Sequence, residues 1–338
     1  MTKTSSARHA SGLLRVTRRL QQEFGPEVQP VVWSKWNRQT TPSDWFLTAE
    51  LFNESERPGA TRFLEERRCR VAAIFHDAIP LRYPHITWPQ SVARHPAYLK
   101  LLARLDHVFA VSQASAADLS GFWRWQGATV RAEVSTITLG SDFDGSSRRA
   151  REESAVSPAP RLLCVGIVEP RKNQTFLLDV AERLWAEGCD FELDVVGRVN
   201  PHFGAPIEKR LVELARREPR CHWHESLDDE ALARLYATAR AVVFPTIAEG
   251  CGLPLLEGLW RGLPIVASDL PVLRENAADG GCLLLPVNDQ TAWAENLRRI
   301  LQDDTLWRDF VTAACSRPLP TWRYCADQIL RKLRGAAT

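Results

Sequence analysis

Residues 161–197, RLLCVGIVEPRKNQTFLLDVAERLWAEGCDFELDVVG, hold two short apolar runs on either side of an amphipathic stretch. Residues 162–166 predict a buried strand that ends at a glycine, and residues 191–197 predict a second strand. Between them, Asn173 can begin a helix with apolar residues at helical spacing, and Gly188 can end it. Two buried strands joined through a helix predict a parallel βαβ unit.

The alternation of strand and helix continues on both sides of this unit. In the second half we expect helices over 207–216, 229–239 and 254–262, and strands over 221–223, 241–244 and 264–267. In the first half we expect helices over 13–24, 97–104 and 115–125, and strands over 28–33, 45–47, 71–75, 107–111 and 134–137. No strand is expected ahead of the helix at 13–24, although a Rossmann-like domain normally opens on one. The fold class predicted is α/β, with two Rossmann-like domains built on parallel sheets.

A polar stretch divides the two halves of the chain. Residues 141–160, SDFDGSSRRAREESAVSPAP, combine charge with Gly, Ser and Pro and predict a linker. We therefore expect a first domain over 1–140, whose first strand is missing, and a second domain over 161–317. Two prolines separate a final helical segment, 318–338, from the helix before it.

Composition narrows the class of protein. The chain has 338 residues, 45% of them hydrophobic and 25% charged, as in a globular protein of about two domains. It contains no apolar run of about 18 residues and no signal-peptide pattern, so we expect a cytoplasmic location. The eight cysteines are scattered without a Cys-x-x-Cys pair, which favours reduced thiols over disulfides or zinc ligands.

Charge is distributed unevenly along the chain. Residues 1–150 hold 20 Lys and Arg against 14 Asp and Glu, a net charge of +6, and the remainder is at −4. The basic half could face an anionic membrane or a phosphate-bearing acceptor, or it could be an ordinary solvated surface. The chain has no nucleic-acid reader motif, no phosphate loop ending in Gly-Lys-Ser/Thr and no Gly-x-Gly-x-x-Gly. This weighs against nucleic-acid binding, NTPases and dinucleotide enzymes.

The strongest functional pattern is Glu249–Glu257, EGCGLPLLE, directly after the strand expected at 241–244. A proline suits the first turn of a helix, so Gly252 and Leu253 would present free backbone N–H groups at a helix start, where anions bind. Glycine lets a phosphate approach the backbone closely. Carboxylates on either side of such a site suit sugar hydroxyls, which suggests a diphosphate with a sugar at each end. The alternative is a capped loop followed by a surface carboxylate.

A second pattern, Gly166 to Asn173 (GIVEPRKN), lies at the carboxyl end of the first predicted strand. Ligands bind at such positions in open α/β sheets. Arg171 and Lys172 are adjacent cations beside a helix start, where positive charge is unfavourable unless an anion lies near. An arginine can clamp a phosphate and a lysine adds a point charge. The alternative is an exposed basic turn.

Weaker candidates lie in the first half. His76 follows the strand at 71–75, where a residue facing a ligand belongs, although a lone histidine there is more often structural. Gly12 stands just inside another helix start preceded by a small residue, Ser11. Ser112 and Ser115 look like a helix cap. Asp142 with Asp144 forms an Asp-x-Asp, a pair that holds a metal on a nucleotide sugar in another class of transferase, but its place at the edge of the linker disfavours that role.

These residues are recognisable as a group. The stretch LLCVGIVEPRKNQ, the Glu-x7-Glu segment and LPIVASDLPVLREN resemble retaining GT-B glycosyltransferases of the glycogen-synthase-like and mannosyltransferase-like group. In the first half, SGLLRVTRRL, IFHDAIPLRYP and VFAVSQASAADL are similar to bacterial O-antigen and exopolysaccharide mannosyl- and rhamnosyltransferases. The resemblance covers most of residues 11–334 and is most specific over 161–290. It implies two Rossmann-like domains facing a central cleft.

The resemblance also implies roles for the residues. The first domain would take the acceptor, the second the nucleotide-sugar donor, and the last helix would cross back to the first domain. Arg171 and Lys172 would neutralise the donor diphosphate, and Glu249 would bind the transferred sugar, with His76 nearby. The remaining implied donor-site residues are Gly12, Gly166, Gly197, Gly252, Leu253 and Glu257, of which Glu257 would hold the ribose.

The implied activity is retaining hexosyl transfer without a metal or other cofactor. A GDP-sugar is the favoured donor, a glycan or lipid-linked oligosaccharide the acceptor, and peripheral contact with the inner membrane is a further expectation. Two residues depart from the usual pattern, Cys251 in place of an aromatic residue and Thr246 in place of serine. A sugar isomerase or phosphorylase on the same scaffold and a degraded, non-enzymatic relative that binds nucleotide or glycan stay open as alternatives.

Overall fold

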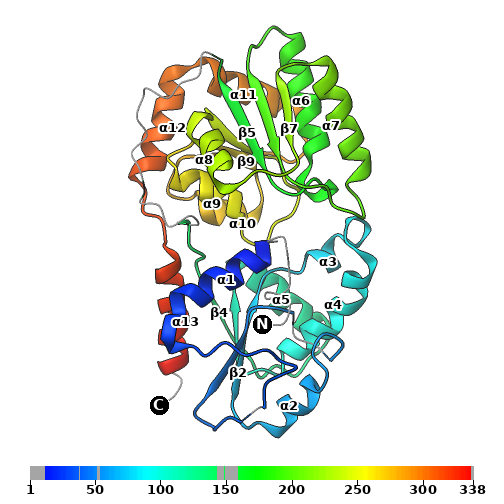
Figure 1. Cartoon of the computed structure of the whole chain (residues 1–338), viewed down its shortest axis with the longest axis vertical. Helices are drawn as coiled ribbons and strands as arrows, with labels where there is room; N and C mark the ends of the chain where they lie inside the picture. Colours follow the sequence, from blue (N-terminus) through cyan, green and yellow to red (C-terminus); the bar gives the residue numbers. More distant parts are fainter. Residues whose placement is uncertain (1–11, 38, 52–53, 143–147, 149–158, 336–338) are drawn as a thin grey trace. The chain divides into compact units, whose positions relative to one another are not determined.

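The computed structural model of the chain describes residues 12–37, 39–51, 54–142, 148 and 159–335. They form two compact units, unit 1 from Met1–Phe143 with Pro320–Thr338 and unit 2 from Asp144–Leu319. Each unit contains one sheet, and every strand pair in both sheets is parallel (Figure 1). The predicted α/β class is confirmed in both units.

Unit 2 is built on a six-stranded sheet in the order β10-β9-β8-β5-β6-β7. Its strands are β5 (Arg161–Val165), β6 (Glu192–Val196), β7 (Cys221–His224), β8 (Ala241–Phe244), β9 (Ile265–Ser268) and β10 (Cys282–Leu285). The strand order turns back between β5 and β8, which are neighbours in the sheet. In open α/β sheets ligands bind outside the carboxyl ends of the strands at such a reversal.

Seven α-helices surround this sheet in the described part of unit 2. They are α6 (Gln174–Ala186), α7 (Ala205–Arg217), α8 (Asp229–Thr238), α9 (Leu253–Trp260), α10 (Pro271–Ala277), α11 (Gln290–Gln302) and α12 (Asp304–Ser316). The apolar stripe of α6 packs on α11, where the rings of Phe176 and Trp293 meet edge to face at 5.6 Å. Trp293 is fully buried, so its contact with Phe176 helps to hold α6 against the core of unit 2.

Unit 1 is built on a four-stranded sheet in the order β1-β2-β3-β4. The strands are β1 (Trp45–Thr48), β2 (Arg70–Phe75), β3 (His107–Ala110) and β4 (Glu133–Thr136). The α-helices are α1 (Gly12–Phe24), α2 (Ala60–Glu66), α3 (Ile79–Arg82), α4 (Pro89–Leu102), α5 (Gln113–Trp125) and α13 (Trp322–Gly335). The first element that the structure describes is α1, and β1 forms an edge of the sheet.

The last helix, α13, is part of unit 1 and packs against α1 (Figure 1). Trp322 and Ile329 on its inner face are fully buried. The chain after β4 passes so close that a Cβ on Gly140 would lie 2.3 Å from the backbone nitrogen of Trp322. Asp142 then accepts a hydrogen bond from that nitrogen at 2.7 Å, which caps the start of α13.

One predicted strand is wrong. Residues 28–33 form no strand, and the short 3-10 helix η1 (Gly25–Glu27) precedes them. Pro30 lacks the N–H that a sheet ladder needs. The apolar character of the segment has another cause, because Trp33 donates its indole N–H to the carbonyl of Pro58 at 3.0 Å and packs edge-on to Phe63.

Candidate functional site

The carboxyl ends of β5 and β6 lie almost in contact through two glycines. Gly166 follows β5 and donates its N–H to Val196 at 2.9 Å, and Gly197 follows β6. A Cβ built on Gly197 would lie 1.9 Å from the carbonyl oxygen of Gly166. No side chain fits at position 197, so packing alone requires a glycine there, apart from the donor-site role that the resemblance implies for Gly197.

We expect Gly197→Ala to lower the unfolding free energy of unit 2 by at least about 1–3 kcal/mol, because the new methyl group overlaps a backbone oxygen that cannot rotate away. Gly121→Ala is the control, since a Cβ there meets no atom within 4 Å. Denaturant unfolding monitored by tryptophan fluorescence measures both variants. Equal stability of Gly197→Ala and the wild type would contradict the close approach.

Arg171 and Lys172 lie in the short 3-10 helix η4 (Pro170–Lys172) beyond β5. Lys172 is only 8% exposed, and its Nζ lies 2.6 Å from Oε1 of Glu249 and 4.7 Å from the centroid of the Phe244 ring. Arg171 donates through Nη1 to the same Oε1 at 2.9 Å. The alternative of an exposed basic turn is therefore wrong, and the two cations surround a buried carboxylate.

Glu249 is held in place through one of its two oxygens. Besides the two cations, Oγ1 of Thr246 lies 2.8 Å from Oε1. Burial alone would raise the pKa of the Glu249 carboxyl, but the charges of Lys172 and Arg171 and the hydrogen bonds from Lys172 and Thr246 hold it below its ordinary value. Oε2 accepts no hydrogen bond from the residues that the structure describes, so it can accept one from a ligand hydroxyl.

Burial also acts on the cation of this pair. Desolvation lowers the pKa of the Lys172 ammonium, and the neighbouring charge of Glu249 only partly opposes this. The positive charge of Lys172 is thus incompletely compensated in a dehydrated position. An anion that reaches Nζ would relieve this cost, which is the electrostatic arrangement of an anion site.

The second candidate for an anion site is the start of α9. Gly252, the residue before the helix, has φ of +85°, and a Cβ there would lie 2.5 Å from the Leu273 side chain. The backbone N–H groups of Gly252 and Leu253 donate to no residue in the described ranges, as expected at a helix N-terminus. Glu257, one turn further, is 2% exposed and accepts a hydrogen bond from the Tyr236 hydroxyl at 3.2 Å. It is not a surface carboxylate.

The first-half candidates, Gly12 and His76, belong to unit 1, and the other eight site residues belong to unit 2. Gly12 opens α1 and is exposed. His76 follows β2, with Nε2 3.2 Å from the carbonyl oxygen of Ala49, and its own carbonyl accepts from Ser115 Oγ at 2.8 Å. Burial lowers the pKa of His76, so its imidazole is neutral at neutral pH.

Two other sequence interpretations have clear outcomes. Ser112 caps α5 by accepting the backbone N–H of Ser115, as predicted. Asp142 caps α13 and lies 3.4 Å from Arg19, while Asp144 lies outside the described residues. Among the residues that the structure describes, no group of three or more His, Cys, Asp and Glu side chains could hold a metal ion.

Sequence reasoning missed the residues that support the cations. Glu169 accepts from Nε of Arg171 at 2.9 Å and from Asn200 at 2.7 Å, which orients the guanidinium. Asn173 does not cap α6 as predicted. It adopts φ of +57° and donates instead to the carbonyl of Pro245 and to Asn288. An asparagine tolerates this left-handed conformation better than most residues. In the sequence, only the place of Asn173 in a strand-to-helix turn indicated such a conformation.

Comparison with known proteins identifies the class of the second half. Residues 159–303 match the family model of the group 1 glycosyl transferases. This part of the chain is a group 1 glycosyl transferase domain. The chain is 32% identical to the serotype-specific mannosyltransferase WbdA of Escherichia coli over 271 residues, which are 76% of this chain and 32% of WbdA. It is 34% identical to O-antigen chain mannosyltransferase B of E. coli over 171 residues, 50% of this chain and 44% of that relative.

The chain spans about a third of the length of the WbdA relatives that it matches. Among solved structures, it superposes on sucrose-phosphate synthase from Thermosynechococcus elongatus with a TM-score of 0.65 at 23% identity, covering 82% of this chain and 71% of that one. For Anabaena HepE in complex with UDP and glucose the TM-score is 0.68 at 16% identity, with 86% and 77% covered. The chain therefore has the GT-B fold, as the sequence predicted.

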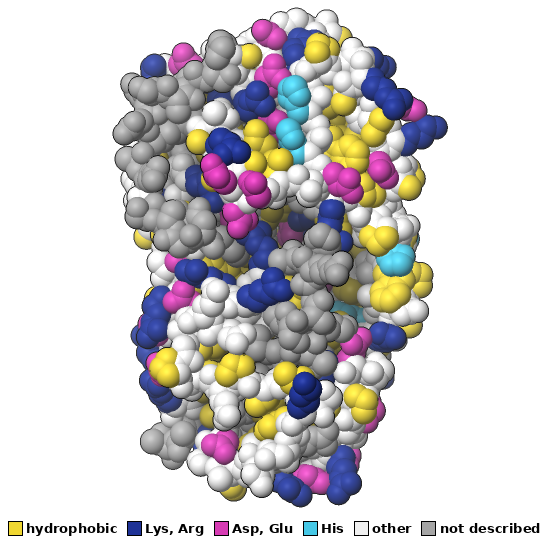
Figure 2. Space-filling view, in the orientation of Figure 1, with side chains coloured by type: hydrophobic (Ala, Val, Ile, Leu, Met, Phe, Trp, Pro, Cys, Tyr) yellow, Lys and Arg dark blue, Asp and Glu magenta, His cyan; other side chains and the backbone are white. Residues whose placement is uncertain are grey.

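The visible surface does not decide whether the basic first half faces an anionic partner or is an ordinary solvated surface. On the face drawn in Figure 2, Lys and Arg side chains are interspersed with Asp and Glu. None of the helices in the described ranges is both long and apolar enough to cross a membrane.

Proposed function

We propose that this glycosyltransferase is a retaining, metal-independent hexosyltransferase that moves a mannose-type sugar from a nucleotide diphosphate donor to a glycan or lipid-linked oligosaccharide in bacterial surface polysaccharide synthesis. A GDP-sugar is the favoured donor. The similarity to O-antigen and serotype-specific mannosyltransferases supports the sugar and the pathway. The complex of HepE with UDP and glucose supports a nucleotide-sugar site in this fold.

The observation that carries the proposal is the buried contact of Lys172 and Arg171 with Glu249 beyond β5 and β8. A departing nucleoside diphosphate develops negative charge in the transition state. Lys172, Arg171 and the N–H groups at the start of α9 are preorganised positive groups that could stabilise this charge. The second oxygen of Glu249 would accept hydroxyls of the transferred sugar, and Glu257 would hold the ribose.

The proposed reaction keeps the anomeric configuration through front-face attack. The acceptor oxygen forms a bond to the anomeric carbon, while the bond from that carbon to the diphosphate oxygen breaks on the same face. The acceptor proton passes to the leaving diphosphate, so no protein nucleophile is required. His76 is assigned a position near the transferred sugar, where its neutral imidazole can form hydrogen bonds but adds no charge.

Nucleotide binding tests the donor site. We expect one nucleotide of the series GDP, UDP, ADP and dTDP, with GDP favoured, to raise the melting temperature, and EDTA to leave the shift unchanged. Binding at a hundredfold excess over Kd adds about 2.7 kcal/mol of apparent stability. The readout is differential scanning fluorimetry. A shift abolished by EDTA would contradict metal independence, and no shift with any nucleotide would contradict the donor site.

Peripheral contact with the inner membrane is part of the proposal, since a lipid-linked acceptor is anchored there. Trp125 at the end of α5 is 77% exposed and Val130 beyond it is 44% exposed, next to the exposed Arg124. Exposed indole and aliphatic groups beside arginine suit the interface of an anionic bilayer.

A second candidate function is a non-enzymatic relative that binds nucleotide or glycan. Such a protein would give the nucleotide shift, yet it would release no nucleoside diphosphate when donor and acceptor are supplied together. A coupled assay for released diphosphate separates the two functions.

A further inference from the structure

Unit 1 contains a cavity of about 510 Å³ that no step of the proposed transfer uses. It runs along β1, all four residues of which line it, and β1 is an edge strand. Leu330 and Leu333 of α13 and the segment that begins at Val28 close its other sides. Its volume falls in the range of about 300–1,000 Å³ that is typical of small-molecule sites.

One wall of the cavity is aromatic. Trp33, Trp36 and Phe46 line it, and the rings of Trp36 and Phe46 are stacked at 5.1 Å with 12° between their planes. Trp33 is packed into the core, but Trp36 and Phe46 are only half-buried. Flat, partly exposed rings at a cavity wall offer a surface on which the C–H face of a sugar ring can pack.

The cavity is also lined by buried polar groups. Glu50 and Arg57 form an ion pair within it, although they are only 5% and 4% exposed. Burying an ion pair costs free energy that its own attraction often fails to offset, so hydrogen bonds between this pair and a ligand rich in hydroxyls would be favourable.

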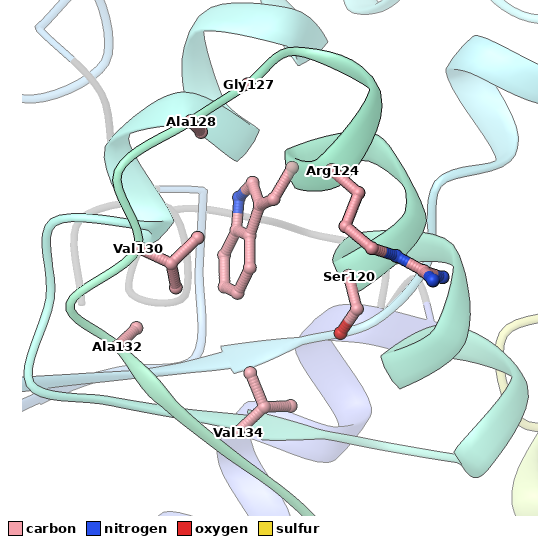
Figure 3. A pocket seen from close by; sticks show the side chains of 8 residues that line it. Ser120, Arg124, Gly127, Ala128, Val130, Ala132 and Val134 are labelled. Atoms are coloured by element: carbon pink, nitrogen blue, oxygen red, sulfur yellow. The ribbon is translucent and has the colours of Figure 1, made fainter.

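A second cavity in unit 1 has a different lining. It measures about 340 Å³ and lies between α5 and the segment that leads into β4 (Figure 3). Ala128, Val130, Ala132 and Val134 form much of its lining, with Arg124 and Ser120 on the helix side (Figure 3). Trp123 of α5 also lines it, but no acidic residue does, so the lining contains no ion pair.

The resemblance to GT-B glycosyltransferases implies that the first domain takes the acceptor, and the larger cavity lies in unit 1. Ala49, just beyond β1, lines the cavity, and its carbonyl oxygen is the atom 3.2 Å from Nε2 of His76. We propose that this cavity binds one hexose of the α-mannose-type acceptor glycan, packed against the stacked pair of Trp36 and Phe46 with its hydroxyls on the Glu50–Arg57 pair. The inference rests on the proposed transfer and adds the residues that would hold its acceptor.

Calorimetric titration of the full chain with α-mannobiose and α-mannotriose, without nucleotide, tests this assignment. We expect both to bind the wild type and Trp36→Ala to weaken binding about tenfold or more, because the stacking surface is lost. Trp36→Phe keeps a ring and should stay within about threefold of the wild type. Trp88→Ala removes an exposed tryptophan outside the cavity and is the matched control, with unchanged binding expected.

The nucleotide shift is measured on the same variants. A Trp36→Ala protein that keeps its shift with GDP but loses the oligosaccharide supports the cavity as the acceptor subsite. Equal oligosaccharide binding by Trp36→Ala and the wild type, or no binding by the wild type, would contradict the acceptor subsite. If GDP still raises the melting temperature in that case, the proposed donor site is unaffected. If Trp36→Ala does not melt cooperatively, Gln39→Trp fills the cavity from its exposed rim, and undiminished binding by that variant overturns the proposal.

Discussion

Lys172→Ala is expected to lower the rate of sugar transfer by about 10²–10³-fold, the usual loss when one preorganised group that stabilises transition-state charge is removed. Lys172 is the buried member of the cation pair, and its Nζ has donors beyond the one that reaches Glu249. The remaining donors are those that a diphosphate would use. Initial rates of nucleoside diphosphate release at saturating donor measure the loss.

Lys209→Ala provides the matched control, because the Lys209 side chain is 78% exposed on α7 and its ion pair with Glu213 spans 3.9 Å. Its rate should equal that of the wild type, since such surface pairs contribute little. Lys172→Met retains the volume of the side chain without the charge and should lose as much rate as Lys172→Ala. Turnover like the wild type in Lys172→Met would remove Lys172 from the donor site.

The residues of this candidate site could be predicted from the sequence because they follow strands. Arg171 and Lys172 come after β5, and Glu249 comes after β8, which the alternation of apolar runs already indicated. Their direct contact required the order of strands in the sheet, since the residues are separated by 77 positions. The strand order places β5 beside β8, and no local pattern carries that information.

Contacts between segments that are distant in sequence also explain the strand wrongly predicted over residues 28–33. Residues 28–33 are apolar because Trp33 packs on Phe63, a contact between distant segments that mimics a strand pattern. The helices α10, α11 and α12 and the strand β10 were left unassigned, although Asp289 and Asp303 cap α11 and α12. The two capping aspartates could have been recognised in the sequence. The hydrogen bond from Asn173 to the carbonyl of Pro245 depends on tertiary packing and could not have been predicted.

Glu249→Ala is expected to lower the unfolding free energy of unit 2 by about 3–5 kcal/mol, the usual result of removing one partner from a buried ion pair. The variant leaves Lys172 buried without its carboxylate, and Arg171 loses a contact as well. Because the folded pKa of Glu249 is lowered, its stabilisation is complete above the unfolded-state pKa of about 4.3 and is lost as pH falls through the folded value. The difference between wild type and variant should therefore shrink in acid.

A double variant separates this stability effect from the chemistry. Lys172→Met combined with Glu249→Gln removes both charges and keeps the volumes, so it should recover most of the stability that Glu249→Ala loses, because uncharged groups of similar size often replace a buried pair without cost. It should nevertheless remain far less active than the wild type, since the diphosphate would lose the charge of Lys172 and the sugar would lose the carboxylate of Glu249. Glu213→Ala, at a carboxylate 61% exposed, is the control for stability. Denaturant unfolding at pH 7 and pH 4 measures all variants, and a Glu249→Ala protein as stable as Glu213→Ala at pH 7 would show that Lys172 does not depend on Glu249.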